Sequence, residues 1–595
     1  MKLRILLLAF IAFHLSTGAA FAQQSRFKAL AFYSETTEPD HVQFALDAVK
    51  FLGNCAAKEQ FTLEATTRWE DLTDERLKDY QLVIWLNESP ARPEQRSAFE
   101  RYMQHGGAWL GFHGAAYNDK DTNWPWYVDF LGGAVFYINS WPPLPARLSL
   151  DDQNHAVTAG ISSSFDSPAN EWYVWNPSPR LNQNVRVLAT LDPSNYPLGF
   201  KDVLTSGDLP AVWSNTKYKM LYMNMGHGDK IFTSPTQNRL IENAVIWLGT
   251  GAVQDSPTAG SGIRISPHGI VVNPKTGKFY AVNTAKDTVT ALDSKGRFLA
   301  RIPAGKEPVS IALNPETNLL YVSNSGSGNV SVIDGNTDKV SAAVPVGDQP
   351  YTIAVNRVAN KVYVSRTFSD VTVIIDGKTN TPVTVKAGVG DAVTAESLDN
   401  ATYMTSFESL QTTVFDGLTD HVSKLSTPNH MWAMAASPAK KKLYAVSVGN
   451  SNVTIIDGNT HTTKVVKAGE NPSAVAVDHT TGKAFIANFA SNDVTVIDGS
   501  TDSVVGTVTV SPKPQAIAVD SSSHKVYVAS THERTVTVLD GTSHSVLGTV
   551  RTDTAPFAIA VNSNTHVAAV LGLDGNLSVI DGTTLAVSSP KQSEQ

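Results

Sequence analysis

The chain has 595 residues, of which 42% are apolar and 17% charged, and its net charge is −8. This length is too great for one hydrophobic core and indicates about two to four domains, while the composition excludes a mainly disordered chain. The negative balance, without any basic cluster, excludes nucleic acid and anionic membrane surfaces as main partners.

The first segment has the features of a secretory signal peptide. Lys2 and Arg4 precede the apolar run ILLLAFIAF, and AFA before Gln23 has the small-x-small pattern of a cleavage site. We therefore expect a signal peptide over residues 1–22 and a secreted or periplasmic protein. The apolar run is short for a permanent membrane-spanning helix, and no later run is long enough, so we expect no integral membrane segment after cleavage.

Residues 27–252 alternate between strand-like and helix-like segments. FKALAFYS and QLVIWLN are short apolar runs typical of strands, and HVQFALDAVKFLGNCAA carries its apolar residues on one helical stripe. RPEQRSAFERYMQHGG has a proline near its start and a Gly-Gly pair at its end, which is typical of a helix, and the strand AWLGFH follows. This alternation predicts an α/β domain with a mainly parallel sheet covered on both faces.

The chain has a single cysteine, Cys55, so it cannot form an internal disulfide. Cys55 lies near the end of the first predicted helix. A reactive thiol usually lies at a sharp turn after a strand or near positively charged groups, and the sequence shows neither around Cys55. We therefore expect Cys55 to be buried and to serve in packing.

The second half is a repeat in which VIDG or a close variant recurs every 40 to 42 residues. Each copy contains four short alternating segments, for example VSIALNP, NLLYVSN, NVSVIDG and KVSAAVPVG, which is typical of a β-propeller blade. The Asp of each copy stands at positions 293, 334, 376, 416, 457, 498, 540 and 581. Eight copies predict eight blades; seven is the alternative, if a divergent terminal copy only completes a neighbour.

The repeated Asp is better explained by turn chemistry than by catalysis, because a catalytic residue would break the repeat. An Asp-Gly pair can adopt the positive φ angles of a hairpin turn. Between the halves, TGAVQDSPTAGSG is small and polar, as linkers are. We therefore expect an α/β domain over residues 23–252, a linker over 253–260 and a propeller over 261–595.

The repeat copies resemble the YVTN family of β-propeller repeats, through phrases such as LLYVSNSGSGNVSVIDG and KAFIANFASNDVTVIDG. The resemblance implies a propeller with a binding surface, and we expect a protein or a cell-surface polymer as its partner. Similar propellers include sugar-lactone hydrolases, so lactonase activity is a further alternative. That activity would require convergent acids in the central channel.

The first half resembles the ThuA-like (trehalose utilisation) family through GGAWLGFHGAAY, NHAVTAGI, NEWYVW and LPAVWSNTKYKMLYMNMGHGDKIF. The resemblance implies a flavodoxin-like α/β fold related to class I glutamine amidotransferases, and a link to oxidised (3-keto) disaccharides. The family's usual HPI reads HAV here, which keeps His155 but loses the proline.

The sharp turn after AWLGF departs from the amidotransferase pattern. Those relatives carry a nucleophilic cysteine at this bend, whereas this chain carries His113 and has its only cysteine elsewhere. Glutamine hydrolysis through a thioester therefore lacks its nucleophile and is excluded. We expect the chain to run on from this bend into a helix, with His113 serving as a base, an electrophile or a ligand.

Four residues are the candidate catalytic groups of this half. His113 and His227 each end an apolar strand, and ligands of open α/β sheets bind beyond the carboxyl ends of the strands, so both should face one cleft. His155, in a polar segment, and Glu171, between aromatic neighbours, complete the set. A carboxylate against aromatic rings can have a raised pKa and act as a general acid or base.

Aromatic residues crowd the first half, and aromatic rings stack on the apolar faces of sugars. We expect Trp124, Trp126, Trp172 and Tyr173 to bind substrate, with His41 at the rim of the same cleft. At least one ring of DTNWPWY should lie near the site.

Imidazoles with one carboxylate would suit zinc or a related divalent ion. The residues are scattered singly along the chain, without the close spacing of an HExxH helix, so the metal stays open and an acid–base pair without metal is the alternative. The leading hypothesis is a secreted carbohydrate-active or carbohydrate-binding protein that holds a saccharide or another small molecule in its first domain. A non-catalytic interaction or scaffold protein is the alternative.

Overall fold

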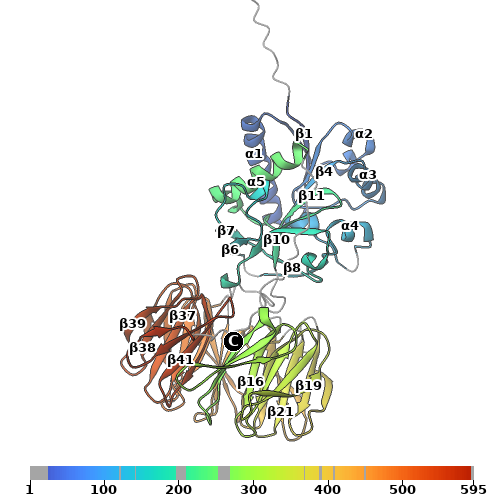
Figure 1. Cartoon of the computed structure of the whole chain (residues 1–595). Coiled ribbons are helices and arrows are strands. Elements are labelled where there is room, and N and C mark those ends of the chain that lie inside the picture. Colours follow the sequence, from blue (N-terminus) through green and yellow to red (C-terminus); the bar gives the residue numbers. More distant parts are fainter. Residues whose placement is uncertain are drawn as a thin grey trace, which may run out of the picture.

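The computed structural model describes residues 25–119, 122–140, 143–195, 209–251, 268–366, 369–387, 392–406, 409–447 and 450–590. These residues form an α/β domain followed by a β-propeller (Figure 1). The expected signal peptide over 1–22 and the expected linker over 253–260 lie outside the described residues. None of the described helices is both long and apolar enough to cross a membrane.

The α/β domain is built on a nine-stranded sheet, in which five neighbouring strands run parallel and the other four continue antiparallel. In spatial order the strands are β2 (Thr62–Thr66), β1 (Lys28–Phe32), β3 (Leu82–Trp85), β4 (Ala108–Phe112), β11 (Lys219–Met223), β10 (Pro210–Asn215), β9 (Val185–Leu191), β6 (Leu144–Leu150) and β7 (Ser164–Asn170). A separate small sheet pairs β5 (Phe136–Asn139) with β8 (Tyr173–Trp175). The α/β class is confirmed, with a sheet that is mixed because residues 144–215 add antiparallel strands.

Helices cover both faces of this sheet. The α-helices are α1 (Pro39–Glu59), α2 (Asp74–Leu77), α3 (Pro93–Gln104), α4 (Pro125–Phe130) and α5 (Pro235–Gly249), and the 3-10 helices are η1 (Trp69–Asp71), η2 (His113–Ala116), η3 (Ala156–Thr158), η4 (Pro179–Leu181), η5 (Pro193–Asn195), η6 (Ile231–Thr233) and, in the propeller, η7 (Thr284–Lys286). Proline begins four of the α-helices, where its missing N–H group costs nothing. Phe44 of α1 and Leu240 of α5 belong to the core on one face, and Phe99 of α3 and Tyr127 of α4 to the core on the other.

Cys55 is buried near the end of α1, as predicted. Burial raises the pKa of its thiol to about 12, and the nearby Glu242 carboxylate adds to this effect. The thiol is therefore protonated at neutral pH and serves packing, because the thiolate is the reactive form.

The propeller has eight antiparallel four-stranded blades, which confirms the predicted number. The first four blades are β12 (Ile270–Val272), β13 (Phe279–Asn283), β14 (Thr288–Leu292) and β15 (Phe298–Pro303); β16 (Pro308–Asn314), β17 (Leu319–Asn324), β18 (Asn329–Asp334) and β19 (Lys339–Pro345); β20 (Pro350–Asn356), β21 (Lys361–Arg366), β22 (Val371–Asp376) and β23 (Pro382–Lys386); and β24 (Ala392–Leu398), β25 (Ala401–Ser406), β26 (Gln411–Asp416) and β27 (Val422–Ser426).

The other four blades continue the same order. They are β28 (Ala433–Ser437), β29 (Lys442–Ser447), β30 (Asn452–Asp457) and β31 (Thr463–Lys467); β32 (Pro472–Val477), β33 (Ala484–Asn488), β34 (Asp493–Asp498) and β35 (Ser503–Thr509); β36 (Pro514–Asp520), β37 (Lys525–Ser530), β38 (Thr535–Asp540) and β39 (Ser545–Arg551); and β40 (Pro556–Asn562), β41 (Val567–Gly572), β42 (Leu577–Asp581) and β43 (Val587–Ser588). The first strands of successive blades contact one another, so they are the innermost strands of the ring.

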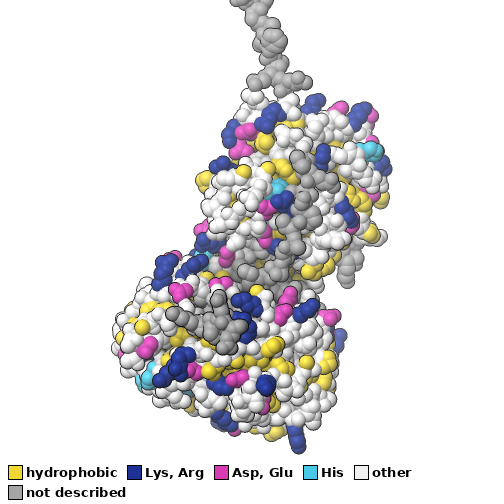
Figure 2. Space-filling model, in the orientation of Figure 1, with side chains coloured by type: hydrophobic (Ala, Val, Ile, Leu, Met, Phe, Trp, Pro, Cys, Tyr) yellow, Lys and Arg dark blue, Asp and Glu magenta, His cyan; other side chains and the backbone are white. Residues whose placement is uncertain are grey.

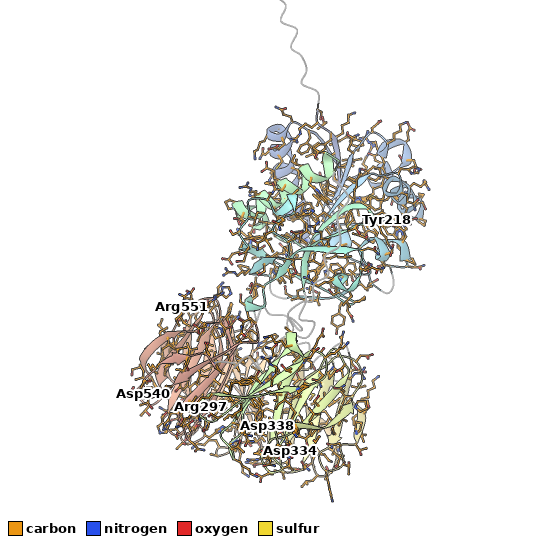
Figure 3. All side chains as sticks on the ribbon, in the orientation of Figure 1. Tyr218, Arg297, Asp334, Asp338, Asp540 and Arg551 are labelled. Atoms are coloured by element: carbon orange, nitrogen blue, oxygen red, sulfur yellow. The ribbon has the colours of Figure 1, made fainter. Side chains whose placement is uncertain are left out.

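The repeated Asp caps the turn between the third and fourth strands of its blade, which confirms its turn role. Asp334 and Asp540 are two examples (Figure 3), and the Asp540 carboxylate accepts hydrogen bonds from two backbone N–H groups at 2.8 and 2.9 Å. The positive φ expected of the Asp-Gly pair is not found there. In seven of the eight copies it falls four residues after the Asp, for example at Asp338 with a φ of 55°. The glycine provides space instead, because a Cβ at Gly582 would lie 2.3 Å from the carbonyl oxygen of His566.

Polar side chains at the ends of the innermost strands join neighbouring blades. Asn562 of blade eight donates a hydrogen bond of 3.0 Å to the carbonyl of Gly277 in blade one, so the ring closes without a shared strand. Between blades seven and eight the same position is Asp520, whose Oδ2 lies 2.8 Å from Nδ1 of His566. These contacts connect one blade to the next through buried polar groups.

The substitution Asp520→Asn should destabilise the propeller in a pH-dependent way. Burial alone would raise the pKa of Asp520, but hydrogen bonds from Ser523, His566 and Ser522 lower it from 3.8 to about 2. Because the folded pKa is the lower one, the stabilisation is complete above the unfolded value and is lost as the pH falls through about 2. We expect thermal unfolding at pH 7 to show a loss of about 1–3 kcal/mol, and the loss to shrink near pH 2. An equal loss at both pH values would contradict this reading.

The two domains contact each other through blade seven. His532, which follows β37, has its Nε2 3.0 Å from the Ser194 hydroxyl and its Nδ1 3.4 Å from a guanidinium nitrogen of Arg147. The side chain of Gln515, at the start of β36, donates to the carbonyl of Ser194. The α/β domain therefore lies at the face of the propeller where the innermost strands begin. Over the view in Figure 2, positive and negative side chains are interspersed on both domains.

Candidate active site in the α/β domain

Three histidines and one glutamate from separate parts of the chain meet at one edge of the nine-stranded sheet. β4 and β11 are parallel neighbours, so the chain leaves both strands at the same edge. His113 follows β4 directly, and His227 is the fourth residue after the end of β11. Glu171 lies between β7 and β8, and His41 lies in the first turn of α1. We call these four residues the histidine cluster.

The Glu171 carboxylate is the centre of the histidine cluster. Its Oε2 lies 3.3 Å from Nε2 of His113 and 3.9 Å from Nε2 of both His41 and His227. The three imidazole rings contact one another edge-on, with centroids 5.0 to 5.8 Å apart. His113 and His227 are buried, whereas the side chains of His41 and Glu171 are 12% and 11% exposed, so solvent reaches the cluster from their side.

His113 occupies a strained backbone position. Its φ of 39° lies in the left-handed region, which costs a residue other than glycine about 1–3 kcal/mol and is typical of functional positions. The helix expected after this bend is the short 3-10 helix η2. The Tyr222 hydroxyl donates to the carbonyl of His113 at 3.2 Å. Gly226 leaves room for the ring, because a Cβ there would lie 2.4 Å from the Cβ of His113.

A backbone hydrogen bond determines which nitrogen of His113 faces Glu171. Nδ1 lies 2.9 Å from the carbonyl oxygen of Asn224, and because a carbonyl only accepts, we assign the proton to Nδ1. Burial lowers the pKa of His113 in spite of the opposing effect of Glu171, so the ring is neutral at pH 7. Nε2 therefore presents a lone pair to a carboxylate oxygen at 3.3 Å. Two acceptors this close call for a cation or a proton between them.

The imidazoles keep Glu171 ionised. Burial alone would raise the pKa of Glu171, but the imidazoles of His113, His41 and His227 around the carboxylate lower it to about 2. The raised pKa expected from its aromatic neighbours in the sequence is therefore wrong, because ring nitrogens surround the carboxylate. The amide of Asn139 donates to the other carboxylate oxygen.

The donor set of the histidine cluster fits a divalent metal ion. Nε2 of His41 and both ring nitrogens of His227 are buried without a hydrogen-bond partner among the described residues. Two acidic residues that the sequence analysis missed, Glu38 and Asp40, bring carboxylate oxygens to 3.8 and 3.9 Å from Nε2 of His227. Glu38, His41 and His227 form one group, and His41, His113 and Glu171 another, and within each group the possible ligand atoms lie within 4.8 Å of one another. Imidazole nitrogen and carboxylate oxygen are zinc ligands.

Two buried asparagines, also missed, hold the cluster in place. The side-chain oxygen of Asn170 accepts from the backbone N–H groups of Gly226 and His227, both at 3.0 Å. The Asn224 side chain makes two hydrogen bonds of 3.2 Å with the backbone of Tyr173. These bonds tie the segment that carries Glu171 to the end of β11. Their signal in the sequence is their position inside NEWYVW and MNMGH, beside residues that were singled out.

His155 lies apart from the cluster. Its Nδ1 accepts from the backbone N–H of Val157 at 3.1 Å, at the start of η3, and its ring packs on Trp247 of α5 with centroids 4.8 Å apart. The structure thus places His155 in a buried capping position on the α5 side of the domain. Its catalytic role stays a prediction, since the contacts described for it are with η3 and α5.

Trp124 and Trp172 are buried in the protein core, and Trp126 is half-buried at its edge. Trp124 stacks on Tyr127 and Trp126 stacks on Phe130, with centroids 4.6 and 5.0 Å apart. Trp172 is fully buried, and its indole N–H donates to a backbone carbonyl at 3.2 Å. None of their ring contacts among the described residues involves the histidine cluster. Tyr127, the third ring of DTNWPWY, donates to the carbonyl of Ala115 in η2 at 2.6 Å, so substrate binding by these tryptophans stays a prediction.

A row of aromatic rings leads from the cluster to the surface. Tyr173, a predicted substrate-binding residue, lies on His113 with centroids 4.0 Å apart. Phe136 follows at 4.8 Å from Tyr173, and Tyr117 at 4.8 Å from Phe136. Tyr117 is 44% exposed. Sequence reasoning missed Tyr117, although it ends the motif GAWLGFHGAAY.

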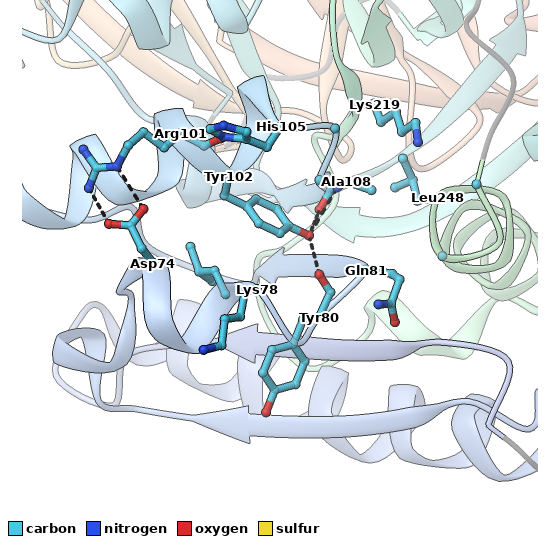
Figure 4. A pocket seen from close by; sticks show the side chains of 15 residues that line it. Asp74, Lys78, Tyr80, Gln81, Arg101, Tyr102, His105, Ala108, Lys219 and Leu248 are labelled. Atoms are coloured by element: carbon cyan, nitrogen blue, oxygen red, sulfur yellow. Dashed lines mark hydrogen bonds and ion pairs between the residues drawn. The ribbon is translucent and has the colours of Figure 1, made fainter.

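A cavity of about 470 Å³ lies at the opposite edge of the sheet (Figure 4). Ala108 and Lys219, the first residues of β4 and β11, line it, together with Tyr102 and the ion pair between Arg101 and Asp74. It contains none of the predicted site residues. Because ligands of open α/β sheets bind at the carboxyl ends of the strands, we place the active site at the histidine cluster.

Two family models match the chain. The ThuA model, described as trehalose utilisation, matches residues 28–248, and a YNCE-like β-propeller model matches residues 271–566. The solved structure of a ThuA-like protein from Bacteroides uniformis is 51% identical over 39% of this chain and 94% of its own chain, with a TM-score of 0.37. The chain belongs to the ThuA-like family. Its ThuA-like domain contains the whole histidine cluster, and the repeat forms a YNCE-like propeller.

A comparison with curated proteins finds no match. Among solved structures, the chain resembles the dihydro-heme d1 dehydrogenase NirN with 14% identity over 61% of this chain and 85% of that chain, at a TM-score of 0.45. It resembles Kuenenia stuttgartiensis hydrazine synthase with 17% identity over 56% of this chain and 100% of that chain, at a TM-score of 0.39. Neither likeness carries an inference about the function of the ThuA-like protein.

Proposed function

We propose that the ThuA-like domain is a carbohydrate-active enzyme that acts on an oxidised (3-keto) saccharide with a divalent metal ion at the histidine cluster. The observation that carries this proposal is the convergence of three imidazoles on one ionised carboxylate at the carboxyl ends of parallel strands. Amidotransferase chemistry is excluded, because the bend that would carry its cysteine carries His113.

The residues of the cluster divide the chemistry between them. His41, His113 and His227 would hold the ion, which is a common ligand set of catalytic zinc. A bound divalent ion would supply Lewis acidity toward the keto oxygen of such a substrate. Glu171, ionised at neutral pH, would accept the proton of the C–H group next to the keto carbon, as the electron pair of that bond moves toward the keto oxygen to give an enolate. Burial keeps the pKa of Tyr173 well above its ordinary value, so its phenol stays neutral and can donate a hydrogen bond to the sugar.

The surroundings of the cluster support a saccharide substrate. Tyr117 exposes an aromatic ring at the outer end of the aromatic row, and such rings stack on sugar C–H faces. The description of the matched family, trehalose utilisation, favours a disaccharide. The signal-peptide pattern of residues 1–22 favours a secreted or periplasmic enzyme. The propeller would then bind a protein or a cell-surface polymer.

Turnover of 3-keto-disaccharides by the full chain tests the proposal. The protein would be stripped with a chelator, reloaded with zinc or manganese, and its products followed by chromatography. We expect activity that depends on the metal and falls by about 100-fold or more in Glu171→Gln, because a positioned general base contributes about 10²–10⁴-fold. Glu94→Gln, an exposed glutamate in the first turn of α3, is the matched control and should keep full activity.

Three outcomes would count against this function. If the metal-loaded protein neither turns over nor binds any member of a broad saccharide panel by calorimetry, the enzyme proposal fails and a non-catalytic scaffold is favoured. Full activity in the chelator-stripped protein would show that the reaction needs no metal ion and would favour catalysis by an acid–base pair alone. Full activity in Glu171→Gln would remove Glu171 from the chemistry.

The propeller channel does not carry the acid set that a lactonase would need. Among the described residues, the cavity in the channel is lined by two carboxylates, Glu396 and Asp399. Asp399 pairs with Lys441 at 3.5 Å, so these acids do not converge on one point as metal ligands would. We therefore propose no lactonase activity.

A further inference from the structure

One residue departs from the propeller repeat at a position that lines the central channel. Glu396, on β24, stands opposite Tyr403 of the next strand. The residues at the same register position in the other blades are Val271, Ala312, Ala354, Ala435, Ala476, Ala518 and Ala560. A residue that serves the fold recurs in every blade, so a glutamate in one blade alone points to a role of its own.

Glu396 lines a cavity of about 600 Å³ inside the channel. The wall consists of the innermost strands of neighbouring blades and is mostly apolar, with residues such as Val271, Ile311 and Ile353. Arg357 and His479 follow innermost strands and line the same cavity. Because the α/β domain contacts the face where these strands begin, the cavity lies toward the opposite face.

No cationic side chain of the described residues pairs with the Glu396 carboxylate, although Arg357 lines the same cavity. Among the described residues it makes no hydrogen bond or ion pair, and burial is the sole cause of its raised pKa of about 7. The channel admits solvent to the side chain, yet protein surrounds it on all sides. An unpaired carboxyl group in an apolar wall destabilises the fold, and such groups concentrate at binding and catalytic sites.

We propose that this cavity binds a small organic ammonium compound, whose cationic group pairs with Glu396 and whose apolar part contacts the wall of innermost strands. The ammonium group supplies the counter-charge that the protein does not provide. An anion without an ammonium group would meet the Glu396 carboxylate and be repelled. The site is separate from the histidine cluster and does not depend on the function proposed for it.

Calorimetry of the full chain with 1-aminohexane tests the proposal, with 1-hexanol and hexanoate as probes of equal length. We expect saturable binding of 1-aminohexane and binding of the other two weaker by about tenfold or more. Glu396→Gln keeps the shape but removes the charge and should weaken the binding of 1-aminohexane by a similar factor. Glu396→Ala restores the residue of six other blades, so it should fold, melt at the same or a higher temperature and show the same loss.

The pH dependence gives a second readout. Binding of 1-aminohexane should strengthen between about pH 6.5 and 8, as Glu396 loses its proton, and stay constant in Glu396→Gln. Burial lowers the pKa of His268 to about 4 and also lowers that of His479, where nearby Arg357 adds to the effect, so both imidazoles stay neutral over this range. Arg357 and Asp399 are the remaining charged groups of the lining. Equal affinity of the parent and Glu396→Gln, equal binding of 1-hexanol, or no saturable binding at millimolar concentrations would overturn the proposal.

Discussion

Replacement of His113 by asparagine should abolish metal binding at the histidine cluster, and turnover with it. Asparagine removes the imidazole but tolerates the left-handed backbone that a φ of 39° imposes. Changing only the hydrogen-bond partner of a metal ligand costs about 10–100-fold in affinity, so loss of the ligand itself should cost more. Calorimetric titration of the chelator-stripped protein with zinc measures the effect.

A matched variant and a stability measurement separate loss of the site from loss of the fold. His421→Asn changes an exposed histidine on a turn of blade four and should leave zinc affinity unchanged. In the parent, zinc at about 100 times its Kd should stabilise the fold by about 2.7 kcal/mol. His113→Asn should lose this stabilisation while it still unfolds cooperatively. Zinc affinity in His113→Asn equal to that of the parent would contradict the proposed site.

The substitution Gly226→Ala should disturb the site by pushing against the buried side of His113. Its Cβ would lie 2.4 Å from the Cβ of His113 and 3.3 Å from a ring carbon of Phe44, and both of these residues are buried. The added methyl group must displace the His113 ring from Glu171. We expect destabilisation of about 1–3 kcal/mol, as for other overpacked cores, together with a loss of zinc affinity. Chemical denaturation and zinc titration measure the two effects.

Gly53→Ala is the matched control for this methyl group. Gly53 lies within α1, and a Cβ there meets nothing within 4 Å. Alanine is the better helix former, so this variant should gain up to about 1 kcal/mol and keep its zinc affinity. If Gly226→Ala were as stable as Gly53→Ala and bound zinc as tightly as the parent, the close packing of Gly226 on His113 would be unimportant.

Much of the fold could be predicted because its signals are local. The eight repeats and the alternation of strands and helices follow from periodicity that each segment carries by itself. The antiparallel half of the nine-stranded sheet could not be predicted in this way, because the partners of β6, β7, β9 and β10 depend on pairing between distant segments. The turn of each repeat was recognised from its Asp, but its geometry depends on a carbonyl from a neighbouring turn that the sequence does not place beside the glycine.

The sequence indicates most residues of the histidine cluster, but it does not indicate their protonation or which residues surround Glu171. His113, His227 and Glu171 were found because motifs mark the ends of their strands, and His41 was assigned only to the rim. The pKa of Glu171 moved in the direction opposite to the expected one, because its real neighbours are imidazoles from distant segments. Trp124 and Trp126 were expected at the site because aromatic residues serve both cores and sugar sites, and composition cannot distinguish the two roles.

Anomalous X-ray scattering from crystals of the full chain soaked in zinc tests the central claim most directly. A peak is expected among Nε2 of His41, His113 and His227, at the zinc–nitrogen distance of about 2.0–2.1 Å from these atoms. Crystals of His113→Asn soaked in the same way should lose the peak. Zinc-soaked parent crystals with peaks elsewhere and none at the histidine cluster would contradict a metal-dependent active site in this domain.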